Sequence, residues 1–396
     1  MGIFTLPPKQ PRADLDIESF LRSDSRKSPI RRMRRALATE WFPQSCIQLT
    51  WPHIDTDWAS MLDEVEETYV RLAFEIATRE PLLIVHPHPD ELKIKLENRL
   101  PHRATDNIHY FACATDDTWS RDHAFLTVIG TGKPELLDFR FNGWGGKFEA
   151  KRDNAINYKL YEASIISGQY VDCLDFELEG GSIETDGMGT LLTTSRCLLN
   201  SNRQHMQEKS LLEAYLSEKF GVTNILWLDH GALLGDDTDS HIDTLARLCP
   251  DRKIVYTMCD DTEDEHYEEL RMMKEQLQTF TDAEGNAFEL IPIPLPDAIY
   301  EDEERLPATY VNYLVMNRAI LMPTYAQIEK DEQARRVLQK IFPKYEVVGI
   351  DCRSLIKQHG SLHCATMQYP KGVLCIDVNQ KKNESRNNSN DLHRQD

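Results

Sequence analysis

The segment "LDEVEETYVRLAFEIATREPLLIVH" (residues 62–86) contains two hydrophobic patterns that together decide the fold class. Its first part has apolar residues at positions 62, 65, 69, 72 and 76. This spacing of three and four residues predicts an amphipathic helix. Its last part, "LLIVH", is a short apolar run that follows a proline and predicts a strand. The segment therefore predicts a helix that leads directly into a strand.

The same alternation continues along the chain. Helical spacing recurs around residues 211–216, 267–277 and 328–341. Further strands are predicted by the short apolar runs "ILWL", "KIVYTM", "YLVM", "AILMP" and "EVVGI". Alternating helices and strands predict an α/β fold. The sequence contains neither GxGxxG after the first strand nor GxxxxGKS/T, so it lacks the fingerprints of dinucleotide-binding and P-loop proteins.

Composition restricts the kinds of partner. The 396-residue chain has 45 Lys and Arg against 65 Asp and Glu, a net charge of −20. An acidic surface repels nucleic acid and anionic membranes and attracts cations toward an acidic cleft. No apolar run approaches the ~20 residues that a membrane-spanning helix needs. We therefore expect a small cationic partner, and neither nucleic acid nor a membrane.

Cysteine usage and the chain ends suggest the organisation. The nine cysteines include no CxxC pair, which argues against a disulfide framework and a Cys-type zinc site. Without a signal-peptide pattern, the chain is expected to be a reduced, cytoplasmic protein. Residues 1–35, which include the basic run "RKSPIRRMRR", are predicted to be a partly disordered extension, and residues 379–396 a disordered tail. Residues 36–378 are expected to form a single domain.

Polar residues concentrate in four stretches. They are "ATDDTWSRDHAF" (114–125), "FELEGGSIETDG" (176–187), "GDDTDSHIDTLARL" (235–248) and "IKQHGSLHCATMQYP" (356–370). Within them, "EGGSIE" and "QHGSLH" resemble each other, which is compatible with a repeated turn module. Each stretch alone has an ordinary explanation, such as a solvated turn or a buried thiol.

Together the stretches carry the parts of a cysteine enzyme that acts on a cation. A thiol and an imidazole supply a nucleophile and an acid/base. Carboxylates without a paired lysine match a planar guanidinium, which they bind bidentately. Carboxylates would raise the pKa of the thiol, and a bound cation would offset that effect.

Two other classes remain open on these residues alone. The first is a metal-dependent hydrolase, with His241, Asp243, His359 and His363 as ligands. That hypothesis leaves the Glu-Gly-Gly and Trp-x-Arg-Asp stretches without a role in the site. The second is a non-catalytic, acidic cation-binding module.

Five motifs in order carry a resemblance to a known family: "TDDTWSRD", "DFRFNGWGGK", "LEGGSIETDGMGTLLTTSRCLLNSNR", "GDDTDSHIDTLARLC" and "GSLHCATMQYP". They resemble agmatine deiminases, which belong to the guanidine-group-modifying (pentein) superfamily together with bacterial peptidylarginine deiminase. The similarity covers roughly residues 38–377. It implies a single catalytic domain of five αβ modules arranged as a pseudo-symmetric propeller around a central site, with no cofactor and no metal.

The resemblance also implies roles for individual residues. Cys364 resembles the nucleophile and His241 the general acid/base. Asp122 and Asp243 resemble the carboxylates that hold the guanidinium nitrogens, and Glu179 the residue that orients His241 or the substrate. Other substrate-binding positions would be Trp119, as a pocket wall, and Gly360, at the turn before the nucleophile. His363 is expected only to pack or hydrogen-bond locally.

The implied reaction converts agmatine to N-carbamoylputrescine and ammonia through a covalent thiouronium on Cys364, a step toward putrescine and other polyamines. Recognition of free arginine would need a positioned Arg or Lys for its carboxylate, and Arg121 and Arg247 are the candidates. Peptidyl or free arginine is therefore the alternative substrate, and a homodimer is a possible assembly. Two departures from the family pattern, Asp-Asp-Thr-Trp and His359-Gly360, touch the pocket rim.

Overall fold

The computed structural model describes residues 35–203 and 208–375. The predicted N-terminal extension lies outside the described residues apart from Arg35, and the predicted tail lies entirely outside them. The described chain combines helices with small mixed sheets, which confirms the α/β class.

One structural unit recurs five times within the described residues. In each, a central strand pairs in parallel with the strand that follows it and antiparallel with another strand, and a helix lies in the connection between the parallel strands. The parallel pairs are β2 (Gln44–Thr50) and β3 (Leu82–His86), β6 (Glu135–Arg140) and β7 (Gln169–Glu177), β9 (Thr190–Thr194) and β10 (Asn224–Leu228), β12 (Lys253–Met258) and β13 (Glu289–Pro294), and β17 (Ala319–Thr324) and β18 (Glu346–Asp351). The antiparallel partners, in the same order, are β19 (Thr366–Pro370), β5 (Leu126–Gly130), β8 (Ile183–Thr185), β11 (Ala246–Cys249) and β16 (Leu314–Val315).

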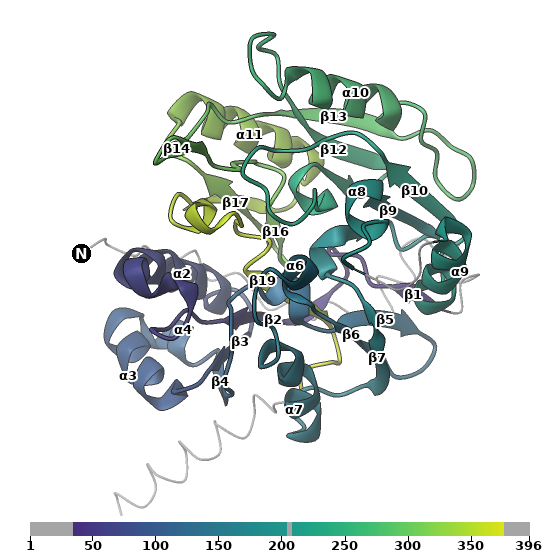
Figure 1. Cartoon of the computed structure of the whole chain (residues 1–396). Coiled ribbons are helices and arrows are strands. Elements are labelled where there is room, and N and C mark those ends of the chain that lie inside the picture. The colour runs from purple at the N-terminus through teal and green to yellow at the C-terminus, as the bar shows by residue number, and fades with distance from the viewer. Residues whose placement is uncertain (1–34, 204–207, 376–396) are drawn as a thin grey trace, which may run out of the picture.

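The helices of the parallel connections lie on the outside of the molecule (Figure 1). They are α2 (Leu62–Ala77), α7 (Ile156–Glu162), α9 (Lys209–Phe220), α10 (Tyr267–Leu277) and α11 (Ile328–Ile341). Additional strands extend or accompany the sheets: β1 (Arg35–Leu37) beside β5, β4 (Ile108–Ala112) beside β3, and the pair β14 (Tyr300–Glu301) and β15 (Glu304–Arg305). The remaining helices and turns are η2 (Asp57–Met61), α3 (Pro89–Arg99), α4 (His102–Thr105), α5 (Ser120–His123), α6 (Gly143–Gly146), η3 (Asp153–Ala155), η4 (Gly180–Ser182), α8 (Ser195–Leu198), η5 (Ile242–Thr244) and η6 (Leu355–Gln358).

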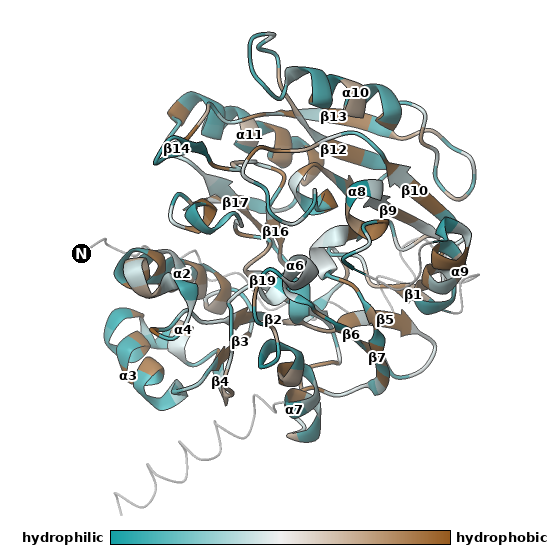
Figure 2. Ribbon diagram, in the orientation of Figure 1, coloured by the Kyte–Doolittle hydropathy of each residue, from teal (hydrophilic) through white to brown (hydrophobic). Residues whose placement is uncertain are grey.

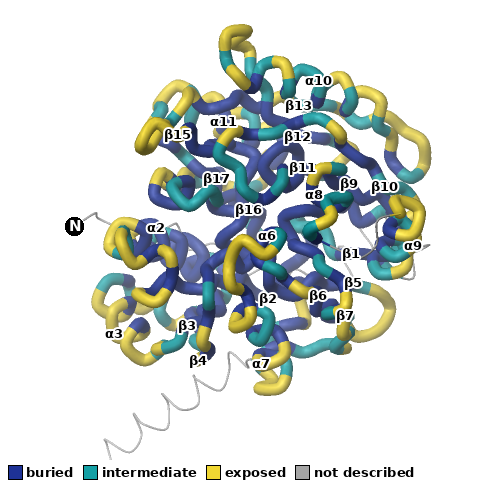
Figure 3. Tube along the Cα trace, in the orientation of Figure 1, coloured by how far each residue is buried: buried dark blue, intermediate teal, exposed yellow. Residues whose placement is uncertain are grey.

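The predicted pattern of residues 62–86 forms as expected. Val65, Tyr69, Leu72 and Ile76 of α2 are fully buried, and every residue of β3 is buried. Figure 2 shows the same division in the other outer helices, whose apolar residues alternate with hydrophilic ones. Figure 3 shows that exposed residues gather on these outer helices and loops, whereas the inner strands are buried. Amphipathic spacing thus positions each helix against its own sheet.

Strands from near the two ends of the described chain, β2 and β19, pair in one sheet. Strand β19 pairs antiparallel with β2, with Thr366 opposite Leu49 and Met367 opposite Gln48. The unit of β2 and β3 is therefore completed by β19, a strand from the other end of the described sequence. None of the described helices is both long enough and apolar enough to span a bilayer.

Candidate active site

The candidate residues occupy equivalent places in the five units. Each lies in the segment that runs into the antiparallel strand of its unit: Asp122 before β5, Glu179 before β8, Asp243 before β11, Asn312 before β16 and Cys364 before β19. Four of these positions were predicted from the sequence, and Asn312 was not. Because the units repeat, these segments come together although they are far apart in sequence.

Cys364 is buried, with 5% of its surface exposed. Its Sγ lies 3.3 Å from Nδ2 of Asn312 and 3.8 Å from Oδ2 of Asp243. Burial, together with the carboxylates of Asp243 and Asp122, raises the pKa of the Cys364 thiol well above its usual range. The resting cysteine is therefore a thiol that needs a nearby positive charge to ionise.

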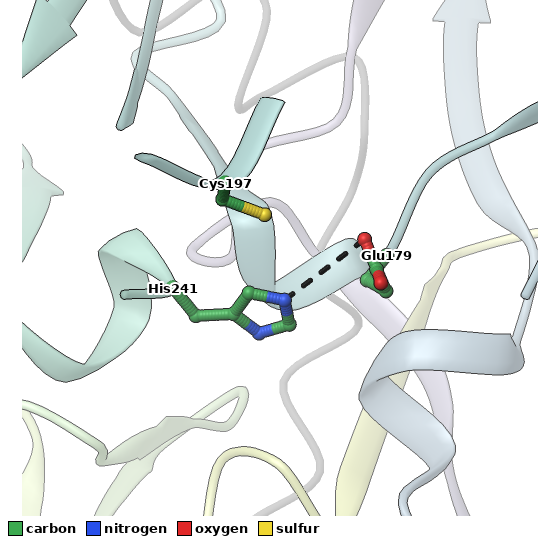
Figure 4. A group of neighbouring side chains, drawn as sticks. All are labelled: Glu179, Cys197 and His241. Atoms are coloured by element: carbon green, nitrogen blue, oxygen red, sulfur yellow. Dashed lines mark ion pairs between the residues drawn. The ribbon is translucent and has the colours of Figure 1, made fainter. Parts of the chain in front are cut away.

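His241 lies between two carboxylates. Its Nδ1 is 3.8 Å from Oδ1 of Asp122, and its Nε2 is 4.0 Å from Oε2 of Glu179 (Figure 4). Burial lowers the pKa of His241, but Asp122, the Cys197 thiol and Glu179 outweigh it and raise that pKa well above its usual range. Among the described residues, neither ring nitrogen has a hydrogen-bond partner. Neither nitrogen is therefore committed to a hydrogen bond within the described structure.

The Asp-rich loop before His241 is held by its own side chains. Asp236 accepts hydrogen bonds from the hydroxyl of Thr238 at 2.6 Å and from the backbone N–H of Ser240 at 2.7 Å. The Thr238 hydroxyl in turn accepts from the backbone N–H of His241 at 3.0 Å. Short acidic and hydroxyl side chains stabilise such turns. The turn fixes the position of the imidazole.

Glu179 is fixed by a buried arginine. Nε of Arg203 donates to Oε1 of Glu179 at 2.6 Å, and NH2 donates to the carbonyl of Thr238 at 2.7 Å. The side chains of Arg203 and Glu179 are 0% and 1% exposed. Oε2 of Glu179, which faces His241, has no hydrogen-bond partner in the described structure. One carboxylate oxygen therefore anchors the residue, and the other remains free at the site.

Asp122 and the Gly-Gly motif depend on each other. Oδ1 of Asp122 accepts from the backbone N–H of Gly181 at 2.9 Å, and Oδ2 accepts from Nε1 of Trp144 at 3.0 Å. A Cβ on Gly181 would lie 2.6 Å from Nδ1 of His241 and 3.1 Å from Oδ2 of Asp243. The first contact is too short for real atoms, and the second is tighter than most. Glycine at this position leaves the space in which the three polar groups meet.

Trp119 packs against the turn that carries the cysteine. A Cβ on Gly360 would overlap the Trp119 ring, so only glycine allows this approach. The residue before it, His359, has φ 63°, and its Nδ1 contacts the carbonyl oxygen of Gly235 at 2.6 Å. A left-handed backbone of this kind favours glycine. In this chain a histidine takes the conformation and forms the extra contact.

A pocket of about 170 Å³ opens beside Cys364. Its walls include the carboxylates of Asp57, Asp117, Asp122 and Asp237 and the rings of Trp119, Trp144 and Phe148. Burial and neighbouring acids raise the pKa of Asp117 to about 7 and that of Asp122 to about 6. Among the described residues that line the pocket, none is Lys or Arg. An acidic, partly aromatic pocket of this kind suits an organic cation.

The two arginines considered for a substrate carboxylate lie elsewhere. Arg247 is buried and paired with Glu184 and Glu40. Arg121 donates to Gln368 and lies 3.4 Å from Glu40. Neither side chain lines the pocket beside Cys364, because both are held by these other partners. The hypothesis that one of them holds a substrate carboxylate there is wrong.

The expectation for His363 is also wrong. Its ring makes no merely local contact, because Nδ1 lies 2.7 Å from Oδ2 of Asp243 and Nε2 lies 2.5 Å from Oε1 of Glu40. Sequence adjacency to Cys364 suggested a local partner. The fold instead brings Asp243, which is 120 positions away, to the imidazole.

The metal-ligand set proposed from the sequence does not assemble. In the described chain, the residue groups whose donor atoms are close enough to share an ion are Glu179, Cys197 and His241, and Glu40, Glu184 and His363. The donor atoms of the first group lie within 4.8 Å of one another. Its residues are shown in Figure 4, and Glu179 already forms an ion pair with Arg203. His241, Asp243, His359 and His363 are not brought together as ligands.

Sequence reasoning missed Asn312, Arg203 and Cys197. Asn312 is fully buried, and its Oδ1 accepts from the backbone N–H of His363 at 2.9 Å. One available signal was the single amide within the apolar run "YVNYLVM". A buried amide requires hydrogen-bond partners, so such a position points to a polar interior.

A thiol, an imidazole and carboxylates around an acidic pocket define the general class of cysteine-dependent sites for cations. The chain belongs to the Porphyromonas-type peptidyl-arginine deiminase family, which matches residues 36–370. It is 32% identical over 360 residues to an agmatine deiminase of Pseudomonas fluorescens, covering 84% of this chain and 95% of that protein. These matches confirm the resemblance seen in the sequence motifs.

Solved structures agree with this membership. A cysteine-to-serine variant of the C. jejuni agmatine deiminase with substrate bound is 36% identical, with a TM-score of 0.78 and coverage of 85% of this chain and 97% of that one. A Porphyromonas gingivalis protein, named provisionally as an arginine deiminase, is 46% identical with a TM-score of 0.81, covering 86% and 99%. The fold is therefore that of these deiminases.

Proposed function

We propose that this chain is an agmatine deiminase, which hydrolyses the guanidinium group of agmatine to give N-carbamoylputrescine and ammonia. The observation that carries the proposal is the pocket beside Cys364, which is lined by four carboxylates and, among its described lining residues, by no Lys or Arg. Agmatine is cationic at both ends. The names of the related proteins support the same substrate.

The reaction uses the thiol in two steps. The substrate cation offsets the carboxylates that raise the pKa of Cys364, so when the guanidinium is bound the thiol releases its proton to solvent and the thiolate forms. Asp122 and Asp243 hold the guanidinium nitrogens. Sγ attacks the guanidinium carbon, and the protonated His241 gives its proton to the departing ammonia. The product of this first step is a covalent thiouronium.

Water then resolves the intermediate. His241, now neutral, takes a proton from the water that attacks the thiouronium carbon, and the C–S bond breaks to return the thiol. The balance is one agmatine cation and one water consumed for one ureido product, one ammonia and one proton. The proton is the one that the thiol released on ionising, and the two protons of the attacking water restore the protonated His241 and the thiol. Glu179, held by Arg203, orients His241 through both steps. Trp119 and Gly360 shape the wall beside the reacting carbon.

Arginine is the second candidate substrate, because the family name and the 46% identical structure both refer to arginine deiminases. Ammonia release measured with agmatine, free arginine and a peptidyl arginine separates the candidates. We expect kcat/KM for agmatine to exceed that for free arginine by about 100-fold or more, since the carboxylate of arginine would enter an acidic pocket unpaired. A peptidyl arginine should also be a poorer substrate than agmatine, because it lacks the second cationic group that the acidic pocket attracts. A preference for arginine would overturn the agmatine assignment, and no release from any substrate would favour a binding protein.

The nucleophile has its own test. Cys364→Ser should abolish turnover and retain agmatine binding, as measured by calorimetry, whereas Cys259→Ser, a partly exposed control, should keep wild-type activity. Iodoacetamide should inactivate the enzyme, and a metal chelator should not. Turnover by Cys364→Ser, or inhibition by the chelator alone, contradicts the mechanism.

We also propose that the five units surround the site as a five-bladed pseudo-symmetric propeller. The support is the repeated pairing pattern, the equivalent places of the site residues, and the pairing of β19 with β2. A single catalytic domain over residues 36–378, a cytoplasmic location and a homodimer stay predictions.

A further inference from the structure

We propose that His363 is a positioning residue of the active site, which holds Asp243 in its working orientation and is itself held by Glu40. The two contacts that carry this proposal are Nδ1 to Oδ2 of Asp243 at 2.7 Å and Nε2 to Oε1 of Glu40 at 2.5 Å. The inference rests on the proposed function, since it takes Cys364 as the nucleophile and Asp243 as a substrate carboxylate.

The two oxygens of Asp243 have different surroundings. Oδ2 contacts the His363 ring and lies 3.8 Å from Sγ of Cys364. Oδ1 is buried and has no hydrogen-bond partner among the described residues. A buried, unpartnered carboxylate oxygen is costly unless a ligand satisfies it. His363 therefore fixes the carboxylate through one oxygen and leaves the other for a substrate nitrogen.

Glu40 makes the imidazole rigid from the opposite side. Its carboxylate pairs with Arg247 and lies 3.4 Å from NH1 of Arg121. Arg247 is itself fixed, because NH1 donates to the carbonyls of Val311 at 3.1 Å and Tyr313 at 3.0 Å. Two long, buried arginines thus anchor the glutamate that contacts the His363 ring. A charge network of this kind orients a group by fixing its neighbour.

Glu40, His363 and Asp243 form a row of groups that share protons through hydrogen bonds. Both ring nitrogens of His363 lie at hydrogen-bond distance from carboxylate oxygens. Each of these two N···O contacts needs a proton between its atoms. Burial, Arg121 and Arg247 lower the pKa of His363 below its usual value and outweigh Glu40 and Asp243, which raise it. Glu184 also faces this histidine. The pKa of Asp243 is held below its usual range, because the hydrogen bond from His363 and nearby positive charges outweigh burial. Asp243 is thereby kept ionised for a guanidinium.

The side chain of Asn312 connects the backbone of His363 and Cys364 to the backbone of Asp243. Oδ1 of Asn312 accepts from the backbone N–H of His363 at 2.9 Å and lies 3.4 Å from that of Cys364. Nδ2 of Asn312 lies 3.4 Å from the carbonyl of Asp243. A displaced imidazole would release the carboxylate of Asp243, and a shift in the backbone of His363 would be passed through Asn312 to Cys364. Small displacements of reacting groups cost large factors in rate.

Two substitutions separate positioning from bulk packing. In His363→Asn, the side-chain NH₂ can occupy the place of Nδ1 and donate to Asp243, although it cannot reach Glu40; His363→Ala has no donor. We expect kcat for ammonia release to fall about 100-fold in His363→Ala and to recover about tenfold of that loss in His363→Asn. His266→Asn is the matched control, because His266 is also buried and contacts a carboxylate, Asp264, through Nδ1 at 3.0 Å.

A substrate-free readout keeps this test independent of the proposed function. The rate at which iodoacetamide alkylates Cys364 should rise about threefold or more in His363→Ala, since a loosened Asp243 no longer raises the thiol pKa to the same extent. It should stay near the wild-type rate in His363→Asn and His266→Asn. Equal effects of Ala and Asn on both readouts, with unchanged melting temperatures, overturn the proposal. A wild-type enzyme inactive on agmatine overturns the proposed function alone, because the alkylation rates still decide the role of His363.

Discussion

The missing side chain of Gly181 allows three charged groups to share one small space. A Cβ there would lie 2.6 Å from the imidazole of His241 and 2.9 Å from Oδ1 of Asp122. Gly181→Ala should therefore lower kcat by about 100-fold, because both groups must move. The control is Gly132→Ala, whose new Cβ meets nothing within 4 Å. Ammonia release with unfolding curves checks the prediction, and activity within threefold of the control, about the scatter of such assays, contradicts it.

The raised pKa values in the pocket predict pH-dependent binding. Asp117 and Asp122 have pKa values of about 7 and about 6 in the free protein, chiefly because they are buried. A cation favours their ionised forms, so protons must leave when it binds. Agmatine affinity should rise through these two pKa values, by about tenfold or more between about pH 5.5 and about pH 8. Calorimetry with Cys364→Ser measures it.

A second variant tests the cause of that dependence. Asp117→Asn removes the group with the higher of the two pKa values, so binding should be weaker at about pH 8 and should change less with pH. An affinity that is flat with pH in the parent protein would show that these carboxylates do not contact the cation.

Single residues were predictable where a sequence motif itself contains the reactive residue types. The thiol, the imidazole and three carboxylates came from such motifs, and the structure places Cys364, His241 and Asp243 beside one another. Their catalytic roles stay predictions. Arg203 and Asn312 could not be found in this way, because their importance lies in contacts with residues distant in sequence. His363 was misjudged for the same reason.

At the scale of elements, helix α9 offers a test in two adjacent leucines. Leu212 is fully buried, whereas Leu211 is 56% exposed. Leu212→Ala should lower the free energy of unfolding by about 2–5 kcal/mol, since it leaves a cavity. Leu211→Ala should change it by about 0.5 kcal/mol or less. Urea denaturation measures both, and equal losses would show that α9 does not pack as described.

Elements with a clear periodicity were predictable, and the site-bearing ones were not. Helices α2, α10 and α11 follow their apolar spacing, and "ILWL" and "KIVYTM" form β10 and β12. The run "YLVM" keeps only Leu314–Val315 as strand β16. Turns such as η4 and η5 contain three residues, too few for any periodicity to appear. Strand pairing is also invisible to local patterns, because β19 and β2 meet only in three dimensions.

At the scale of the whole molecule, charge should govern the encounter with substrate. The net charge is −20, and the pocket is lined by carboxylates. Such a field attracts a dication, and salt screens it. We expect kcat/KM for agmatine to fall about threefold to tenfold between about 20 mM and about 300 mM NaCl. Alkylation of Cys364 by uncharged iodoacetamide is the control and should not change, and a salt-independent kcat/KM would contradict electrostatic steering.

The pairing of β19 with β2 has a consequence for synthesis on the ribosome. Strand β2 is made early, but the strand that covers its edge ends at Pro370 and carries Cys364 just before it. An uncovered strand edge can pair with other chains. The nascent chain must therefore keep this edge protected through most of translation. A chain released too early lacks the covering strand, so incomplete products should be prone to aggregate.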